Sequence, residues 1–203
     1  MSPRQNRVLP TGEIVAEPCR GLFMGNRGIL HDGAGGLGVA RWRHPHWVCC
    51  VLQFKGRHRQ VMAPNNYTEL FFLDEAVALA AGHRPCAECR RADFNAFRGA
   101  FGPDLRAPEM DAILHPARVD RKTRQQIRHQ AAIDRLPDGS FIQHEGTAHL
   151  VRAGRILPFG ASGYGPARPR PRGPVTVLTP EPTLRALRNG YRPVLHHSAT
   201  TGP

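Results

Sequence analysis

Two cysteines, Cys86 and Cys89, stand three positions apart in the segment GHRPCAECRR. A zinc ion takes four soft or borderline ligands in a tetrahedron, and a Cys-x-x-Cys pair where a loop meets a helix brings two sulfurs to one side of the metal. Pro85 and the residues after it favour such a junction. The positive end of the helix and the neighbouring arginines favour thiolate, the form that binds metal. The sequence therefore predicts that both cysteines are zinc ligands.

Two other interpretations of the pair are open. A thioredoxin-like redox pair is expected directly after a buried strand, whereas the helix-forming segment EAVALAA and Gly82 precede the motif here. The pair could also be two reduced surface cysteines without a function. The preceding helix favours metal binding over redox chemistry.

The sequence contains no second Cys-x-x-Cys motif, so the other zinc ligands must come from elsewhere. HWVCCVLQF, KGR and HRQVM are typical of a β-hairpin that turns at residues 54–56. In that hairpin Cys50 and His58 share one face and Cys49 lies on the other, so Cys50 and His58 are the predicted third and fourth ligands. Cys49 and Cys50 would also suit a buried core, because cysteine is among the most buried residue types. His83 is the alternative ligand.

Helices are expected on both sides of the cysteine motif. Asp74 is suited to cap the segment EAVALAA, and Gly82 supplies the left-handed position that ends it. A second helix is expected to begin at about Pro85 or Cys86 and to carry three phenylalanines on one side before Gly102 ends it. The zinc site is thus predicted between a hairpin and the start of a helix.

The rest of the chain contains further predicted elements. PEMDAILHPARVDRKTRQQIRHQ is a third helical segment, kinked or split at Pro116. SFIQH, TAHLVRA and RILPF are typical of the strands of a meander with tight turns. GASGYGPARPRPRGP has the composition of an extended basic loop, and PVTVLTPEPTLRALRNG that of a strand and a helix that Gly190 ends.

These elements predict the α+β class, with small antiparallel hairpins and short helices around a zinc site and a C-terminal β-meander with a helix. Two regions are expected. Residues 1–104 form a zinc-containing domain, and residues 105–203 form a basic helix, β-meander and strand-helix region that packs on it.

The charge of the chain is unbalanced: 203 residues include 28 basic and 16 acidic side chains, a net charge of +12. Lys55 and Lys122 are the only lysines, and the planar fork of arginine suits phosphate groups and base edges. A nucleic-acid partner is therefore predicted, DNA in preference to RNA. A genome-wide preference for arginine is the alternative explanation. The arginines expected to bind nucleic acid are Arg57, Arg59, Arg84, Arg90, Arg91, Arg124 and Arg128.

The chain start lacks the apolar run of a secretory signal, and no stretch approaches the roughly 18 apolar residues of a membrane span. Its five cysteines, an odd number, do not form a disulfide framework. In a reducing compartment paired thiols more often hold metal than form bridges. The sequence thus predicts a cytoplasmic protein without a membrane partner and leaves its oligomeric state open.

The segment FFLDEAVALAAGHRPCAECRR resembles the second half of the metal-binding N-terminal domain of the Ada family of DNA-repair proteins. In that family an aromatic strand, a short alanine-rich helix and a G-x-R-P-C-x-x-C-R run deliver two of four zinc cysteines, which match Cys86 and Cys89 here. The resemblance covers about residues 47–91 and implies zinc binding in a repair protein.

In the Ada family the other two zinc cysteines follow a strand and a turn, and one of them takes a methyl group from a DNA phosphotriester. The corresponding segment here, KGRHRQVMAPNNYTE, contains no cysteine. The resemblance thus implies zinc binding without methyl transfer. The ending VTVLTPEPTLRALRNGYRPVLHHSA is similar to a family of bacterial proteins, a likeness that implies no activity.

A different chemistry is suggested by His115, Asp120 and His129, from which a metal-dependent nuclease or a glycosylase-like site could be assembled. A basic helix with solvated charges and buried histidines explains the same residues without catalysis. The leading hypothesis is a zinc-containing nucleic-acid-binding protein. The alternatives are an enzyme that acts on nucleic acid and a zinc-stabilised protein-interaction module.

Overall fold

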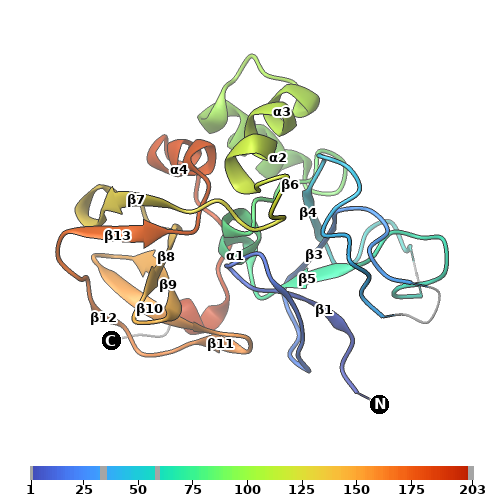
Figure 1. The fold of residues 1–203 in the computed structure, drawn as a ribbon. Helices are drawn as coiled ribbons and strands as arrows, with labels where there is room; N and C mark the ends of the chain where they lie inside the picture. Colours follow the sequence, from blue (N-terminus) through green and yellow to red (C-terminus); the bar gives the residue numbers. More distant parts are fainter. Residues whose placement is uncertain (1, 33–35, 58–59, 201–203) are drawn as a thin grey trace.

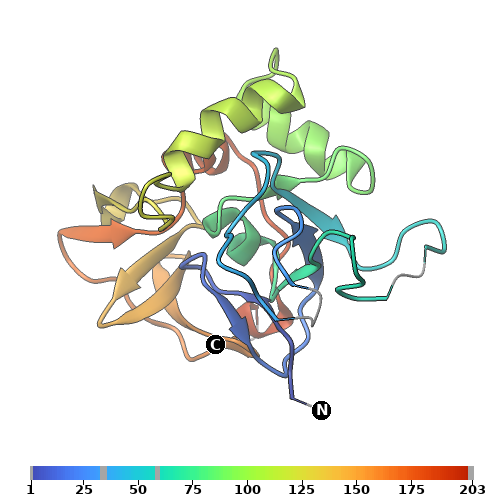
Figure 2. The same ribbon diagram turned by 45° about the vertical axis from the view of Figure 1, so that its right-hand side comes forward.

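Two β-sheets lie on either side of a short central helix, α1 (Glu75–Ala80), in a computed structural model that describes residues 2–32, 36–57 and 60–200 (Figure 1). Three longer helices, α2 (Arg91–Phe101), α3 (Ala107–Arg118) and α4 (Glu181–Arg188), lie together above the sheets in the two views (Figures 1 and 2). The α+β class predicted from the sequence is confirmed. Within the described ranges, none of the helices has the length and apolar character that crossing a membrane requires.

The first sheet contains the cysteine motif at its edge. Its strands, in spatial order, are β2 (Ile14–Ala16), β1 (Gln5–Val8), β5 (Leu70–Phe72), β3 (Phe23–Asn26), β4 (Val48–Val51) and β6 (Arg84–Pro85). β4 pairs antiparallel with β3 and parallel with β6, so both of its hydrogen-bonding edges are occupied. The predicted hairpin of residues 46–54 with residues 58–62 is therefore wrong, and described residues 60–69 form no strand.

The second sheet contains the predicted meander. Its strands, in spatial order, are β11 (Gly163–Tyr164), β10 (Arg155–Gly160), β9 (Thr147–Arg152), β8 (Phe141–His144), β13 (Pro174–Val177) and β7 (His129–Ala132). β12 (Arg168–Pro169) also pairs with β10. The meander is confirmed, but residues 160–174 are not simply an extended loop, because β11 and β12 add to the sheet and Tyr164 is buried.

The helices follow the sequence in part. Asp74 caps α1 by accepting a hydrogen bond from Val77 N at 3.0 Å, and Gly82 has the predicted left-handed conformation with a φ of +84°. α2 begins at Arg91, later than expected, and buries the three predicted phenylalanines. The third segment is helical only as far as Arg118, because a bridge between Val119 and Gln126 turns the chain back and leads it into β7.

The two predicted regions share their cores. All six residues of α1 are buried, most of them in one cluster with Leu70 and Phe72 of the first sheet and Phe141 and Leu150 of the second. A second cluster joins Phe94, Phe97 and Phe101 of α2 to residues of α4 and the second sheet. Residues on both sides of position 104 thus belong to the same hydrophobic clusters.

A buried carboxylate, Asp74, connects α1 to the C-terminal part of the chain. Besides capping the helix, it accepts hydrogen bonds from the Tyr164 hydroxyl at 2.8 Å and from His196 N at 3.0 Å. Burial raises the pKa of Asp74 to about 6, although the three donors act in the opposite direction. The side chain thus satisfies three donors from segments that are far apart in the sequence.

Asp74→Ala is expected to lower the free energy of unfolding by about 3 kcal/mol or more, because it removes a helix cap and leaves buried donors without acceptors. Chemical denaturation followed by circular dichroism measures this. Asp104→Ala, an acid-to-alanine change at an exposed position, is the control and should stay within about 0.5 kcal/mol. Equal effects of the two changes would contradict the role given to Asp74.

Candidate metal centre

Three thiols converge where β4 and β6 end. The sulfurs of Cys50, Cys86 and Cys89 all lie within 4.8 Å of one another, and all three residues are partly buried. β4 supplies Cys50. Cys86 directly follows β6, and the parallel pairing of β6 with β4 brings it alongside, with Cys86 N donating to the Cys49 carbonyl at 2.9 Å. The structure therefore unites the predicted pair with the predicted third ligand.

The loop between Cys86 and Cys89 is a tight turn that leads into α2. Arg90 N donates to the Cys86 carbonyl at 3.1 Å, and Glu88 N lies 3.4 Å from the Cys86 sulfur as a donor. Tetrahedral zinc with Zn–S bonds of about 2.3 Å separates its sulfurs by about 3.8 Å. Three soft donors at the observed spacing fit such an ion, so the cluster can hold a metal.

The electrostatics of the cluster favour metal-binding thiolates. A hydrogen bond from the Cys50 thiol lowers the pKa of Cys86 to about 5 against the opposing effect of burial, and backbone N–H groups of Cys89 and Glu88 act in the same direction. The pKa of Cys89 is also lowered, mainly by Cys50, while the pKa of Cys50 is raised because its thiol is the donor. Thiolates bind metal, whereas thiols do not.

Neighbouring Cys49 is excluded from the cluster by the alternation of side chains along β4. It is fully buried in the core, its sulfur lies 3.5 Å from Arg90 Nη1, and burial raises the pKa of its thiol. The structure thus places Cys50, and not Cys49, beside the predicted pair. The hairpin prediction is wrong, but the two cysteines still face opposite sides, because the alternation of faces belongs to the strand itself.

The fourth ligand stays a prediction. His58 lies outside the described residues, as does Arg59. The alternative, His83, is fully buried away from the thiols, with its Nε2 3.3 Å from Arg27 Nε and its ring against Phe72. Among the His, Cys, Asp and Glu side chains of the described ranges, the three cysteines form the only group with metal-ligand spacing.

Two arginines predicted to bind nucleic acid are instead held in the interior. Arg84 makes two hydrogen bonds to Asp111, at 2.8 and 2.7 Å, and is 4% exposed. Arg90 makes two hydrogen bonds to Glu75, each at 2.9 Å, and is 3% exposed. For these two residues the prediction is wrong, because the buried carboxylates occupy the forks that a phosphate would need.

The other described arginines of that set are exposed. Arg57 forms an ion pair with Glu88 at 3.1 Å beside the cysteine loop, and Arg91 is the first residue of α2. Arg124 donates to the Val39 carbonyl, and Arg128 donates to Gln143. These four side chains remain available at the surface for an anionic partner.

The three candidate catalytic residues lie in separate environments. His115 is buried with its ring edge-on to Trp42 and Trp47, and burial lowers its pKa to about 4.

Asp120 is exposed and accepts hydrogen bonds from the turn that follows it, whereas the His129 side chain lies 3.5 Å from Glu181. Within the described residues they form no group with metal-ligand spacing. The structure therefore does not assemble a hydrolytic site from His115, Asp120 and His129.

A second feature of the structure was not indicated by any sequence motif. Arg27, Trp47 and Arg118 are buried together beside a cavity of about 630 Å³. In the sequence, only the abundance of arginine pointed toward it.

No protein-family model, curated protein or solved structure matches the chain.

Cys50→Ser and Cys86→Ser are each expected to reduce bound zinc from about one ion per chain to a small fraction, because two thiolates alone hold zinc weakly. Elemental analysis of protein purified under reducing conditions measures this. Cys19→Ser removes a thiol outside the cluster and is the control. His58→Ala in the same series tests the fourth ligand. A full metal content in Cys86→Ser would contradict the site.

Arg90→Met is expected to lower the free energy of unfolding by about 3–5 kcal/mol, because it leaves Glu75 buried without its ion pair. Denaturation measures the loss, and Arg91→Ala is the control one position later. The exposed Arg91 should contribute within about 0.5 kcal/mol. If Arg91→Ala were the more damaging change, the structural role of Arg90 would be refuted.

Proposed function

We propose that the protein is a zinc-containing nucleic-acid-binding protein of the DNA-repair or nucleic-acid-processing type. The observation that carries the proposal is the convergence of Cys50, Cys86 and Cys89 to within 4.8 Å of one another. Thiol ligands at this spacing favour zinc over harder ions such as Mg²⁺ or Ca²⁺. The resemblance of the same segment to the Ada family supports the nucleic-acid part of the proposal.

The metal has a structural role in this proposal. When bound, zinc crosslinks the end of β4 to the loop before α2. Cys50, Cys86 and Cys89 then fix the first turn of α2, and with it the direction of Arg91. Arg57 lies against the same loop through its ion pair with Glu88. The site thus positions two exposed cations beside the metal.

The charge of the protein supports a polyanionic partner. A net charge of +12 in a chain of 203 residues attracts nucleic acid over long range. Exposed arginines at the cysteine loop and in the segment after α3 can contact phosphates. The proposed partner is DNA in preference to RNA. The reduced cysteines suit the cytoplasm, where thiols remain available to metal.

Methyl transfer of the Ada type is not proposed. That reaction uses a cysteine after the strand and turn, and residues 55–69 of this chain contain none. The three clustered thiols are instead supplied by β4 and by the loop before α2. Binding without covalent repair is therefore the activity that the residues support.

The affinity for duplex DNA is expected to fall steeply with salt, because binding releases counterions from the phosphates. Replacing both Arg57 and Arg91 by alanine should weaken binding on all sequences and reduce the slope of log K against log [salt] by about 2. Fluorescence anisotropy with a labelled duplex at several salt concentrations measures both quantities.

Arg20→Ala removes one exposed charge that is not among the predicted contacts and is the control, with a smaller effect expected. Affinity that does not change between low and moderate salt would refute the nucleic-acid part of the proposal. A metal content of one zinc per chain combined with no DNA binding would instead favour a zinc-stabilised interaction module.

A further inference from the structure

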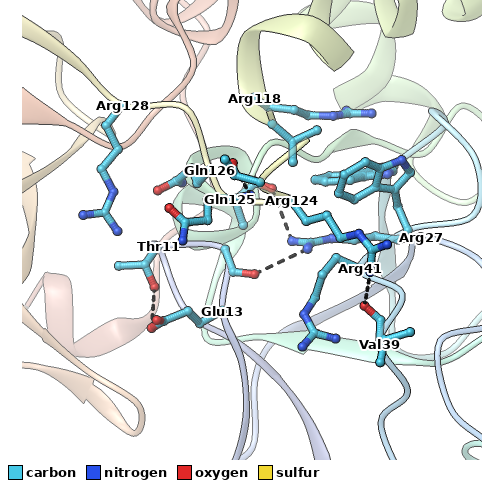
Figure 3. A pocket seen from close by; sticks show the side chains of 16 residues that line it. Thr11, Glu13, Arg27, Val39, Arg41, Arg118, Arg124, Gln125, Gln126 and Arg128 are labelled. Carbon is cyan, nitrogen blue, oxygen red and sulfur yellow. Dashed lines mark hydrogen bonds between the residues drawn. The ribbon is translucent and has the colours of Figure 1, made fainter. Parts of the chain in front are cut away.

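A cavity of about 630 Å³ lies between the first sheet and the segment that follows α3 (Figure 3). Five arginines line it, and both tryptophans of the chain, Trp42 and Trp47, lie on its wall. Figure 3 shows Arg27, Arg41 and Arg124 gathered at one side of the cavity and Arg128 at the other. The cavity is large enough for a small organic ligand.

Two of these arginines enclose one indole ring. The guanidinium carbons of Arg27 and Arg118 each lie 4.1 Å from the centroid of the Trp47 ring. Two cations at that distance cannot share one face of the ring, so the indole lies between them. Arg27 is 3% exposed and Arg118 is 2% exposed. Two positive charges are thus buried on opposite faces of one ring, each 4.1 Å from its centroid.

Among the described residues, neither buried guanidinium is paired directly with a carboxylate. Arg27 contacts His83, Gly12 O and Ala81 O at 3.3–3.4 Å, all of them neutral or weak acceptors.

Arg118 donates to the Gly82 and Pro45 carbonyls, and its Nε has no hydrogen-bond partner. Asp111, the carboxylate whose charge acts on Arg118, is already bound to Arg84 and His46. In the described part of the chain no carboxylate forms an ion pair with Arg27 or Arg118.

Burial of uncompensated cations is costly, and the pKa values report this cost. Desolvation, aided by Arg41, lowers the pKa of Arg27 to about 9. Desolvation also lowers the pKa of Arg118 to about 9, with Arg27 and Arg84 acting in the same direction and Asp111 opposing them. An anion in the cavity would remove the penalty.

The other charged residues of the wall are mostly cationic. Arg41, Arg124 and Arg128 donate to neutral oxygens, and the described residues include no ion pair for any of them. Glu13, the one acid of the wall, accepts from the Thr11 hydroxyl at 3.0 Å. The Gln126 carboxamide oxygen is buried without a donor.

We propose that this cavity binds a phosphomonoester group carried by a nucleotide, with the phosphate held by Arg27, Arg41 and Arg124, which lie together at one side of the cavity. This inference goes beyond the proposed function and does not depend on the metal centre. Guanidinium forks bind phosphate oxygens in pairs, which explains why the cavity uses arginines. The phosphomonoester is borne by a free nucleotide or by the end of a nucleic-acid strand.

The size and the aromatic wall favour a nucleotide over inorganic phosphate. A phosphate ion would fill only a small part of a cavity of about 630 Å³. Trp42 is partly exposed on the wall, and an indole face is a platform on which a base can stack. The Gln125 carboxamide, which also lines the cavity, can hydrogen-bond to the edge of a base.

The intrinsic fluorescence of the protein reports directly on the cavity, because its two tryptophans both line it. Titration of the full chain with adenosine 5′-monophosphate is expected to change this fluorescence and to saturate. Inorganic phosphate should bind more weakly than the nucleotide, and adenosine, which lacks the phosphate, should bind at least about tenfold more weakly. No saturable response to adenosine 5′-monophosphate at millimolar concentration would overturn the proposal.

Arg41→Ala and Arg124→Ala are each expected to raise the dissociation constant for adenosine 5′-monophosphate by about tenfold or more. Arg172→Ala removes the same charge at an exposed position outside the cavity wall and should leave it within about twofold. Arg41 is only partly buried and Arg124 is exposed, so both variants are expected to fold. Equal losses in Arg41→Ala and Arg172→Ala would show a general charge effect and overturn the site.

Competition experiments with two oligonucleotides identify the source of the phosphate. A 5′-phosphorylated strand that competes with adenosine 5′-monophosphate better than the same strand with a 5′-hydroxyl supports a strand end. Equal competition by the two strands, with nucleotide binding still sensitive to Arg41→Ala, supports the free nucleotide. Because Cys86→Ser should not change nucleotide binding while it removes zinc, failure of this inference and failure of the proposed function are distinguishable.

Discussion

The structure depends on two adjacent buried carboxylates, Asp74 and Glu75, at the start of the central helix. A buried charge without partners costs several kcal/mol, so each must be satisfied by groups that the rest of the fold brings to it. Asp74 accepts from the hydroxyl of Tyr164 and from the backbone of His196, and Glu75 accepts from the hydroxyl of Tyr191 and from Val194 N. The C-terminal part of the chain is thereby attached to α1, the helix that lies between the two sheets.

The metal centre is tied to the same point. Glu75 also binds Arg90, the residue that follows Cys89, so the loop of the cysteine motif is anchored to α1 from one side. From the other side, the short strand β6 pairs with β4 and sets Cys86 beside Cys50. A metal would therefore complete a site whose backbone is already fixed by an ion pair and by a parallel strand pair, which reduces the entropy that binding must overcome.

The arginines of the interior fall into two groups with different meaning. Arg84 and Arg90 are paired with carboxylates and stabilise the fold. Arg27 and Arg118 are equally buried, but they contact the two faces of one indole ring and neutral carbonyl groups, and not a carboxylate. Charges that the protein leaves uncompensated at such cost are a mark of sites that receive an opposite charge from a ligand. The same residue type thus holds the structure in one place and offers a binding site in another.

The sequence by itself determined what depends on local chemistry. Asp74 and Gly82 delimit α1, the phenylalanines of α2 share one face, and the turns of the meander lie where their glycines predict, because caps, periodicity and left-handed positions act over a few residues. The alternation of a strand likewise separated Cys49 from Cys50. Only the tertiary structure decided that β4 pairs with β6 and not with the segment after it. It also decided that Arg90 faces Glu75 and that Arg27 meets Arg118 across Trp47. These are contacts between residues far apart in the chain, and no local pattern encodes which distant strand edge or buried charge a side chain will meet.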